Sequence, residues 1–173
     1  MLLISLFSFG AFANKLNIDT KSLPMDLSFS RKRGNGSRNI YLFCDLECPH
    51  CIRTEKFFNQ LDDINIHTFV FPVASYHPDA PRKTNAVWCS GDKAKAWQSW
   101  FDKGELPSNP NNCKAPLAEI DQFAHSHNIE LPVIIFEDGT GYHAEDFIYA
   151  TLSLDKLREL IDDHSINSSK KNL

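Results

Sequence analysis

The segment Phe43-Cys44-Asp45-Leu46-Glu47-Cys48-Pro49-His50-Cys51 is the most informative part of this chain. It follows an apolar run at 39–44 and precedes a helical pattern from Ile52 to Leu61, so Cys48 is predicted at a strand-to-helix junction. At a helix N-terminus, unpaired backbone N–H groups and the helix dipole favour negative charge. Because the thiolate is the reactive form of cysteine, this position favours thiol–disulfide chemistry.

The whole chain has the composition of an ordinary globular protein. It has 173 residues, 42% of them hydrophobic and 23% charged, which is enough for one domain with a substantial core. The net charge of −4 offers no electrostatic basis for binding nucleic acid. The basic cluster Arg31-Lys32-Arg33, joined by Arg38, flanks Gly34-Asn35-Gly36, and we interpret it as the solvated turn of a β-hairpin.

The N-terminal residues indicate export. Residues 2–12 are almost wholly apolar and end in Ala11-Phe12-Ala13, which predicts a signal peptide at 1–13 that is cleaved after Ala13. The run is too short to span a bilayer, which needs roughly 20 apolar residues. No Lys or Arg precedes it, so either the chain starts further upstream or the signal is atypical. The alternative is a buried N-terminal segment.

Cysteine usage agrees with export, because disulfides persist in oxidising compartments. All five cysteines follow the apolar run, and an odd count leaves at least one thiol unpaired. Cys44 lies four residues before Cys48, at the end of the predicted strand. It is either a small buried hydrophobic residue or a third redox thiol that exchanges with a Cys48–Cys51 bridge. The sequence leaves both interpretations open.

Hydrophobic periodicity and turn residues indicate a mixed order of strands and helices. We predict strands at 26–30, 39–44, 64–73, 131–137 and 142–148, and helices at 52–61, 81–90, 92–101, 116–128 and 153–161. Strand 26–30 is expected to form the hairpin with strand 39–44. The order predicts an α/β domain at 26–163, in which helices flank a mixed central sheet and form an insertion, with a linker at 14–25 and a polar tail at 164–173.

Several motifs occur together along this domain. They are Phe43-x-Asp45-x-x-Cys48-Pro-His-Cys51, the helical insertion, Leu131-Pro132 at the start of a strand, Phe71-Pro72, Ala86-Val87-Trp88-Cys89, Asn112-Cys113 and Gly139. In this combination the chain resembles the thioredoxin fold and, more specifically, the catalytic domain of the DsbC/DsbG family of periplasmic disulfide isomerases. The resemblance covers about residues 26–160. It implies a periplasmic protein thiol–disulfide oxidoreductase or isomerase.

The resemblance also implies how the active site works. Cys48 would be the nucleophile that attacks a substrate disulfide, and Cys51 would resolve the mixed disulfide. Pro49 and His50 separate the two thiols, and we expect His50 to lower the pKa of Cys48 and make the disulfide more oxidising than that of thioredoxin. Glu47 would oppose this effect electrostatically. No cofactor is expected beyond a redox-active Cys48–Cys51 disulfide.

Two further features are implied by the resemblance alone. Pro132 would be preceded by a cis peptide bond, which would bring the backbone of Leu131 beside Cys48. There it could pair with an extended substrate strand and keep metal away from the dithiol. Cys89 and Cys113 would form a structural disulfide across the insertion; the alternative is two buried free thiols.

The chain departs from this family in several respects. The 14–25 segment is too short for the N-terminal dimerisation domain of DsbC and DsbG, so we expect a monomer. Pro49-His50 is the dipeptide of the oxidase DsbA, and Leu131 stands where DsbC-like proteins have threonine. Leu42 stands where thioredoxin has a buried acid. Isomerase, oxidase and reductase directions therefore all remain open.

Two other classes of function compete with disulfide exchange. A metal-binding module could use Cys44, Cys48, Cys51 and a histidine, although the chain has no second Cys-x-x-Cys. A non-catalytic binding protein is the third possibility, and the intact dithiol argues against it. For the enzyme we expect exported cysteine-containing substrate proteins and an unidentified membrane redox partner, and no nucleic acid.

Overall fold

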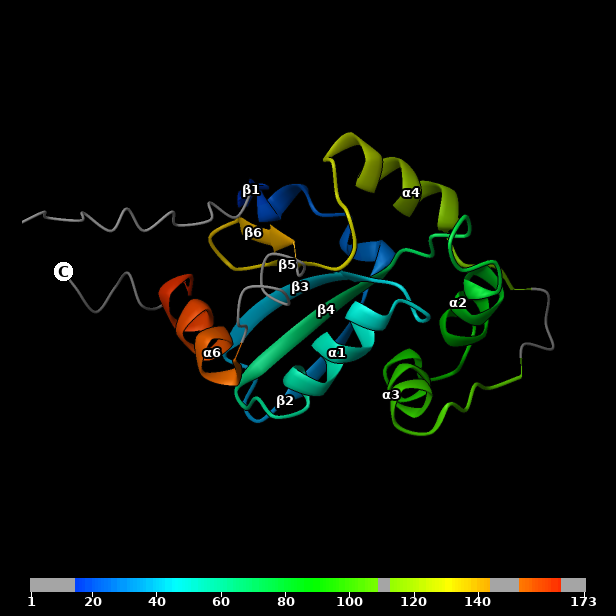
Figure 1. The fold of residues 1–173 in the computed structure, drawn as a ribbon, viewed down its shortest axis with the longest axis horizontal. Helices are drawn as coiled ribbons and strands as arrows, with labels where there is room; N and C mark the ends of the chain where they lie inside the picture. The colour runs from blue at the N-terminus through cyan, green and yellow to red at the C-terminus, as the bar shows by residue number, and fades with distance from the viewer. Residues whose placement is uncertain (1–14, 109–112, 144–152, 166–173) are drawn as a thin grey trace, which may run out of the picture.

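The computed structural model describes residues 15–108, 113–143 and 153–165. They form a mixed six-stranded sheet with the strand order β1-β6-β5-β3-β4-β2 (Figure 1). The strands are β1 (Lys15–Asn17), β2 (Phe29–Arg33), β3 (Arg38–Cys44), β4 (Ile64–Val70), β5 (Val133–Ile135) and β6 (Thr140–His143). The helices are α1 (Pro49–Phe58), α2 (Ala80–Trp88), α3 (Lys93–Lys103), α4 (Leu117–Ser126) and α6 (Leu154–Asp163).

Strand β3 lies inside the sheet and leads directly to the dithiol. It pairs in parallel with β4 and antiparallel with β5. Parallel strands need a crossover connection, and α1 supplies it between β3 and β4. The sequence prediction of an α/β fold with a mixed sheet is confirmed.

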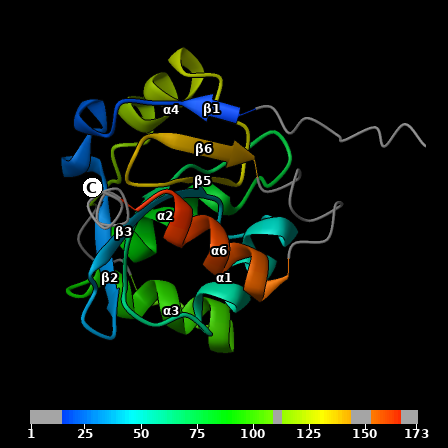
Figure 2. The same cartoon turned by 90° about the vertical axis from the view of Figure 1, so that its left-hand side faces the viewer.

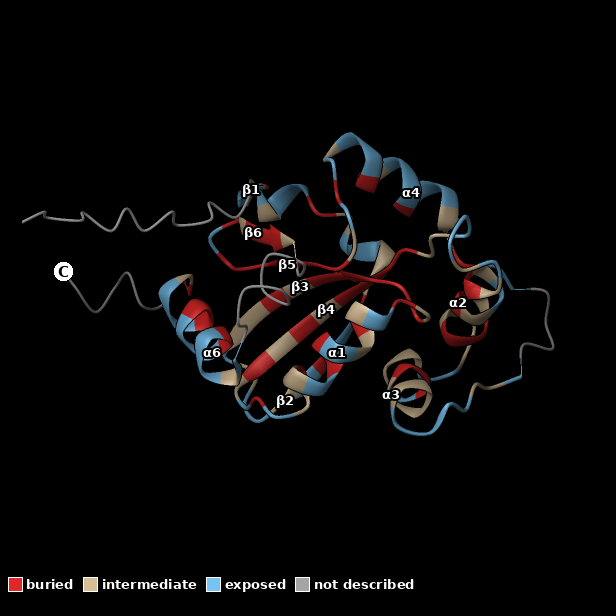
Figure 3. Ribbon diagram, viewed as in Figure 1, coloured by how far each residue is buried: buried red, intermediate tan, exposed pale blue. Residues whose placement is uncertain are grey.

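Helices cover both faces of the sheet, so the hydrophobic core has two parts. In Figures 1 and 2, α1, α3 and α6 lie on one side of the sheet and α4 lies on the other. Neighbouring residues of β3 show this division, because Leu42 and Cys44 pack in the α1 side of the core and Phe43 in the α4 side. Buried positions run along β3 and β4 in Figure 3. Burial on both faces explains why β3 is apolar without interruption from Ile40 to Cys44.

The predicted hairpin between β2 and β3 is wrong. The two strands are consecutive, but β2 pairs antiparallel with β4, which lies between them in the sheet. β3 already has β4 and β5 as neighbours, so it has no edge left for β2. The turn instead packs on the connection into β4, where Asp63 accepts hydrogen bonds from the backbone N–H groups of Asn35 and Arg38, each at 3.1 Å.

The interpretation of the basic cluster as solvated is also wrong for its first residue. Arg31 is only 7% exposed and makes two 2.7 Å hydrogen bonds to the carboxylate of Glu55 on α1. Thr68 of β4 accepts a third at 3.2 Å, and the ring of Trp97 lies 5.6 Å from the guanidinium. The period of two along β2 turns Arg31 inward beneath α1, where a buried carboxylate compensates its charge.

Part of the stretch that the sequence predicted to be a linker belongs to the fold. Residues 15–17 form β1, which pairs antiparallel with β6, and Ile18 and Leu23 are buried in the α4 side of the core. Gly139 has a φ of +87°, and a Cβ atom there would lie 2.4 Å from the carbonyl oxygen of Ile18. Glycine at 139 therefore lets the β5–β6 turn and the N-terminal segment meet.

The helical insertion consists of α2 and α3, between β4 and α4. A disulfide joins Cys89, at the end of α2, to Cys113, just before α4. This pairing agrees with the one that the family resemblance implied.

Some sequence predictions fall outside the described residues. They are the signal peptide at 1–13, residues 144–148 of the last strand and most of the polar tail. Of the helices that the structure does describe, none combines the length and the apolar character needed to cross a membrane.

Candidate active site

The dithiol lies at the junction of β3 and α1, as the sequence predicts. Cys48 is the N-cap residue of α1 and Pro49 occupies the first turn, where the missing N–H of proline costs no helical hydrogen bond. The carbonyl oxygen of Cys48 accepts the first helical bond from Ile52 at 3.0 Å. Cys48 is 7% exposed, whereas Cys51, one turn further on, is fully buried.

Three free thiols share this part of the core, because Cys44 lies in the same cluster as Cys48 and Cys51. The backbone N–H of Asp45 donates a 3.1 Å hydrogen bond to the sulfur of Cys51. Burial raises the pKa of Cys44 to about 11. Burial, followed by a hydrogen bond with Cys44, also raises the pKa of Cys51 well above its usual value.

The environment of Cys48 differs from the sequence expectation. A hydrogen bond with the Cys51 sulfur, followed by burial, raises the pKa of Cys48, whereas the backbone N–H groups of Cys51 and His50 act to lower it. The helix N-terminus thus acts in the predicted direction, but the second sulfur and burial outweigh it. Cys48 is nevertheless the one thiol of the three with exposed surface, so it is the first that a substrate can reach.

A groove of about 720 Å³ opens beside Cys48. Its walls come from the start of α1, the segment after β4, the end of α4 and the residues before β5. The lining residues include Cys48, Pro49, His50, Phe71, Pro72, Val73, His77, His125, Ile129 and Leu131. The Leu131–Pro132 peptide bond is cis, and Pro132 is buried. The structure therefore brings Cys48, Pro49, His50 and Leu131 to one groove, with Pro132 just behind Leu131.

Asp45 is a site residue that sequence reasoning quoted in a motif but gave no role. It is fully buried, and its carboxylate accepts hydrogen bonds from the backbone N–H groups of Glu47 and Val73, both at 2.8 Å. The Nδ1 atom of His77 lies 2.9 Å from the same carboxylate. Asp45 thus ties the loop before Cys48 to the segment after β4 that forms the opposite wall of the groove.

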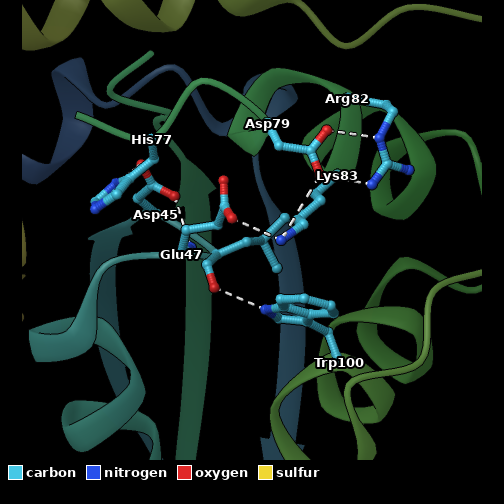
Figure 4. Close-up of polar contacts among 8 residues, drawn as sticks. Asp45, Glu47, His77, Asp79, Arg82, Lys83 and Trp100 are labelled. Atoms are coloured by element: carbon cyan, nitrogen blue, oxygen red, sulfur yellow. Dashed lines mark hydrogen bonds and ion pairs between the residues drawn. The ribbon is translucent and has the colours of Figure 1, made fainter. Parts of the chain in front are cut away.

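The insertion also holds this loop, through Lys83 of α2 and Trp100 of α3 (Figure 4). Lys83 is 2.6 Å from the carboxylate of Glu47 and 4.3 Å from the ring centroid of Trp100. Trp100 donates its indole N–H to the carbonyl oxygen of Leu46 at 2.7 Å. Because Lys83 pairs with Glu47, the expected repulsion between Glu47 and a Cys48 thiolate is partly offset.

Glu55 is a second buried acid that the sequence did not reveal. Thioredoxin's buried acid is replaced here by Leu42, but Glu55 on α1 is only 1% exposed and lies one turn beyond Cys51. Its negative charge raises the pKa of Cys44 by a smaller amount than burial does, and Arg31 lowers it. A helical spacing of four residues after Cys51 was the signal that could have placed Glu55 on the buried face of α1.

Metal binding was the main rival to redox chemistry. Within residues 15–108, 113–143 and 153–165, no three His, Cys, Asp or Glu side chains are grouped so that they could hold a metal ion.

Comparison with known proteins identifies the family. The model of the thioredoxin-like domain matches residues 25–162. The probable thiol:disulfide interchange protein DsbC of Bordetella pertussis is 30% identical over 124 residues, which are 71% of this chain and 43% of that protein. DsbC of Escherichia coli K12 is 24% identical over 143 residues, 76% of this chain and 54% of that protein. The chain therefore spans about half the length of the curated relatives it matches.

Solved structures give the same result. The crystal structure of a disulfide interchange protein from Neisseria gonorrhoeae has a TM-score of 0.71 and 32% sequence identity, and the match covers 82% of this chain and 98% of that one. The catalytic domain of Proteus mirabilis ScsC, at 16% identity and a TM-score of 0.53, shares the fold over 80% of this chain and 89% of that one. The chain belongs to the thioredoxin-like domain family, and within it is similar to the DsbC-type thiol:disulfide interchange proteins.

Proposed function

We propose that this chain catalyses thiol–disulfide interchange on cysteine-containing proteins through Cys48 and Cys51. The observation that carries the proposal is the groove that Cys48 and Leu131 line together. A substrate segment in this groove would lie beside both the nucleophile and the backbone of Leu131. The similarity to proteins named thiol:disulfide interchange protein supports the same reaction.

The reaction follows from the positions of the two sulfurs. The Cys48 thiolate attacks one sulfur of a substrate disulfide, and the other substrate sulfur leaves as a thiolate. Cys51, buried one turn along α1, then attacks Cys48 within the mixed disulfide and releases the first substrate sulfur. The backbone of Leu131 pairs with the extended substrate. In the opposite direction, the Cys48–Cys51 disulfide oxidises a substrate dithiol.

The direction of electron flow is the finer part of the proposal. A disulfide is strongly oxidising when its reduced form is stabilised as a thiolate of low pKa, which is the situation in DsbA. In this chain the contact with Cys51 raises the pKa of Cys48, which argues against a strongly oxidising couple, and the similarity to proteins named DsbC favours the isomerase. The Pro49-His50 dipeptide favours the second candidate, a DsbA-like oxidase.

The proposal also includes the cellular location of the reaction and the partners of the protein. The apolar run before Ala13 and the Cys89–Cys113 disulfide support an exported protein that works in the periplasm on exported substrates. A membrane redox partner would restore the working redox state, and the chain would act as a monomer with no cofactor other than its own cysteines.

Refolding assays separate the two directions. The protein is added to scrambled ribonuclease and, separately, to reduced ribonuclease, and recovery of ribonuclease activity is measured. An isomerase is expected to rescue the scrambled substrate, whereas activity on the reduced substrate alone would exclude the isomerase direction. The variant Cys51→Ala is expected to trap substrates as mixed disulfides on Cys48, and failure to trap any would contradict the proposed mechanism.

A further inference from the structure

One histidine on the wall of the groove is held by a fully buried carboxylate. His77 lies in the segment between β4 and α2, and its backbone N–H donates a 2.9 Å bond to the carbonyl oxygen of Val73. Its Nδ1 atom is 2.9 Å from Oδ2 of Asp45, and the His77 side chain is 23% exposed while that of Asp45 is buried completely. In Figure 4 the imidazole lies against Asp45 and points away from the cluster around Lys83.

The hydrogen bonds of Asp45 determine which nitrogen of His77 is available for chemistry. Both carboxylate oxygens already accept backbone N–H groups, one from Glu47 and one from Val73. An ionised carboxylate can only accept hydrogen bonds, so Nδ1 of His77 carries a proton toward Asp45. Nε2 is then the ring nitrogen left to act as a proton acceptor, or as a proton donor when the ring is protonated.

His77 and Cys48 line the same groove from different elements. The other titratable groups on its walls are His50 from α1, Asp121 and His125 from α4, Glu130 and Tyr76. His125 pairs with Asp121 at 3.3 Å on the exposed surface of α4. The carboxylate partner of His77 is buried, whereas that of His125 is exposed to solvent. The imidazole of His77 is therefore held in place by a side chain of the protein interior.

We propose that His77, oriented by Asp45, is a catalytic residue that exchanges a proton with the substrate sulfur in the groove. This inference rests on the proposed thiol–disulfide interchange at Cys48. When the Cys48 thiolate forms a bond to one substrate sulfur, the substrate S–S bond breaks and its electron pair goes to the leaving sulfur. Nε2–H of the imidazolium gives that sulfur its proton. In the oxidising direction, neutral Nε2 removes the proton from the substrate thiol. The resulting thiolate attacks Cys48, the Cys48–Cys51 bond breaks, and its electron pair goes to the Cys51 sulfur.

A proton donor is useful when the substrate is a disulfide of alkyl thiols such as cysteine. A cysteine thiol has a pKa of about 8.5, so a leaving cysteine sulfur is protonated at neutral pH, and histidine is the side chain that ordinarily titrates near neutrality. General acid–base catalysis contributes roughly 10²–10⁴-fold in enzymes. A thiolate is already a fair leaving group, so we expect a contribution of about tenfold from His77, which is below that range.

The test compares two disulfides in the variant His77→Gln. One is an alkyl disulfide peptide, and the other is 5,5′-dithiobis(2-nitrobenzoic acid), an aromatic disulfide whose leaving thiolate is stable without a proton. Both reactions are followed by stopped flow between pH 5 and 9 in a Cys51→Ala background, which isolates the attack by Cys48. His127→Gln, at the end of α4 and outside the groove, is the matched control.

We expect His77→Gln to slow the alkyl disulfide at least about tenfold near neutral pH and to leave the aromatic disulfide unchanged, with His127→Gln affecting neither. Equal slowing of both disulfides would overturn the inference, because it would place the effect on Cys48 or on folding. An unchanged alkyl rate would overturn it too. The variant Asp45→Asn is expected to slow the alkyl reaction in the same selective way. A wild-type protein unreactive with either disulfide would instead contradict the proposed function itself.

Discussion

The two cysteine pairs of this domain have opposite environments. Cys48 and Cys51 are free thiols in the hydrophobic core, at the first turn of α1. Cys89 and Cys113 form a disulfide at the outer end of the insertion, where Cys113 is exposed. Greater exposure therefore does not mark the pair that we propose to be reactive. That pair is distinguished by close spacing at a helix N-terminus and by a groove that Cys48 lines.

The two cysteine pairs also differ in sequence separation, and this difference predicts different roles for them. Cys48 and Cys51 are three residues apart on one helical turn, so a disulfide between them closes a very small loop. Cys89 and Cys113 are 24 residues apart, so their disulfide restricts a long loop of the unfolded chain. We therefore expect one pair to carry the reaction and the other to carry stability, and the following experiments test that division.

The largest effect is expected from Cys48→Ser. Loss of the nucleophile should reduce disulfide exchange to the uncatalysed rate, because Cys51 is fully buried and cannot meet a substrate. The free energy of unfolding by urea should change little, since serine is close to cysteine in size. Exchange with a disulfide peptide measures the first and urea titration the second. Substantial exchange by Cys48→Ser would show that another thiol is the nucleophile.

The double variant Cys89→Ala, Cys113→Ala should lose stability and keep disulfide exchange. Chain-entropy reasoning for a loop of 24 residues predicts a loss of about 3.5 kcal/mol in the free energy of unfolding. Exchange at Cys48 should persist at temperatures where the variant is folded. A variant of unchanged stability that had lost exchange would reverse the assigned roles.

Alkaline pH should also distinguish the two pairs. The pKa values of Cys44, Cys48 and Cys51 are all raised in the folded, reduced protein. The unfolded thiols ionise first, so the stability of the reduced protein should be complete below about pH 8.5 and fall as the pH rises above it. Closing the Cys48–Cys51 disulfide should weaken this dependence, and the Cys89–Cys113 disulfide contributes none because it does not titrate. Urea titrations of both redox forms at pH 7 and pH 10 measure the effect, and equal pH dependence of the two forms would contradict it.

The smallest effect is expected from Cys44→Ala. Cys44 is fully buried beside Cys51, and removing its sulfur should cost about 1 kcal/mol of stability, the scale for one buried heavy atom. As a packing residue it should leave the reduction potential of the Cys48–Cys51 couple and the turnover unchanged. A shift in either quantity would support the alternative, in which Cys44 exchanges with the active disulfide.

Local features of the site could be predicted because they depend on residues close in the chain. The apolar run of β3 and the helical pattern after Cys51 identify the junction, and Pro49 is compatible with the first turn of α1. The pairing of Cys89 with Cys113 and the cis bond before Pro132 came from the family resemblance. Spacing and composition alone would have left both undecided.

Contacts between distant segments could not be predicted in the same way. β2 was expected to pair with the strand that follows it, but β4 lies between them. Arg31 was expected in solvent, but it meets Glu55, 24 residues away, beneath α1. Asp45 contacts His77, and Glu47 contacts Lys83. Each partner lies more than 30 residues further along the chain. Each of these contacts exists only because the sheet and the insertion place separate segments together.

By itself, the sequence determined that Cys48 lies at the N-terminus of a helix after a buried strand, since hydrophobic periodicity, a first-turn proline and cysteine spacing are local signals. Only the tertiary structure decided how readily Cys48 ionises and what surrounds it. The helix N-terminus favours the thiolate, but the neighbouring Cys51 sulfur and burial outweigh it. Cys51 lies on the same helical turn as Cys48, but the burial of both sulfurs depends on how α1 packs against β3, because this packing removes water from around them.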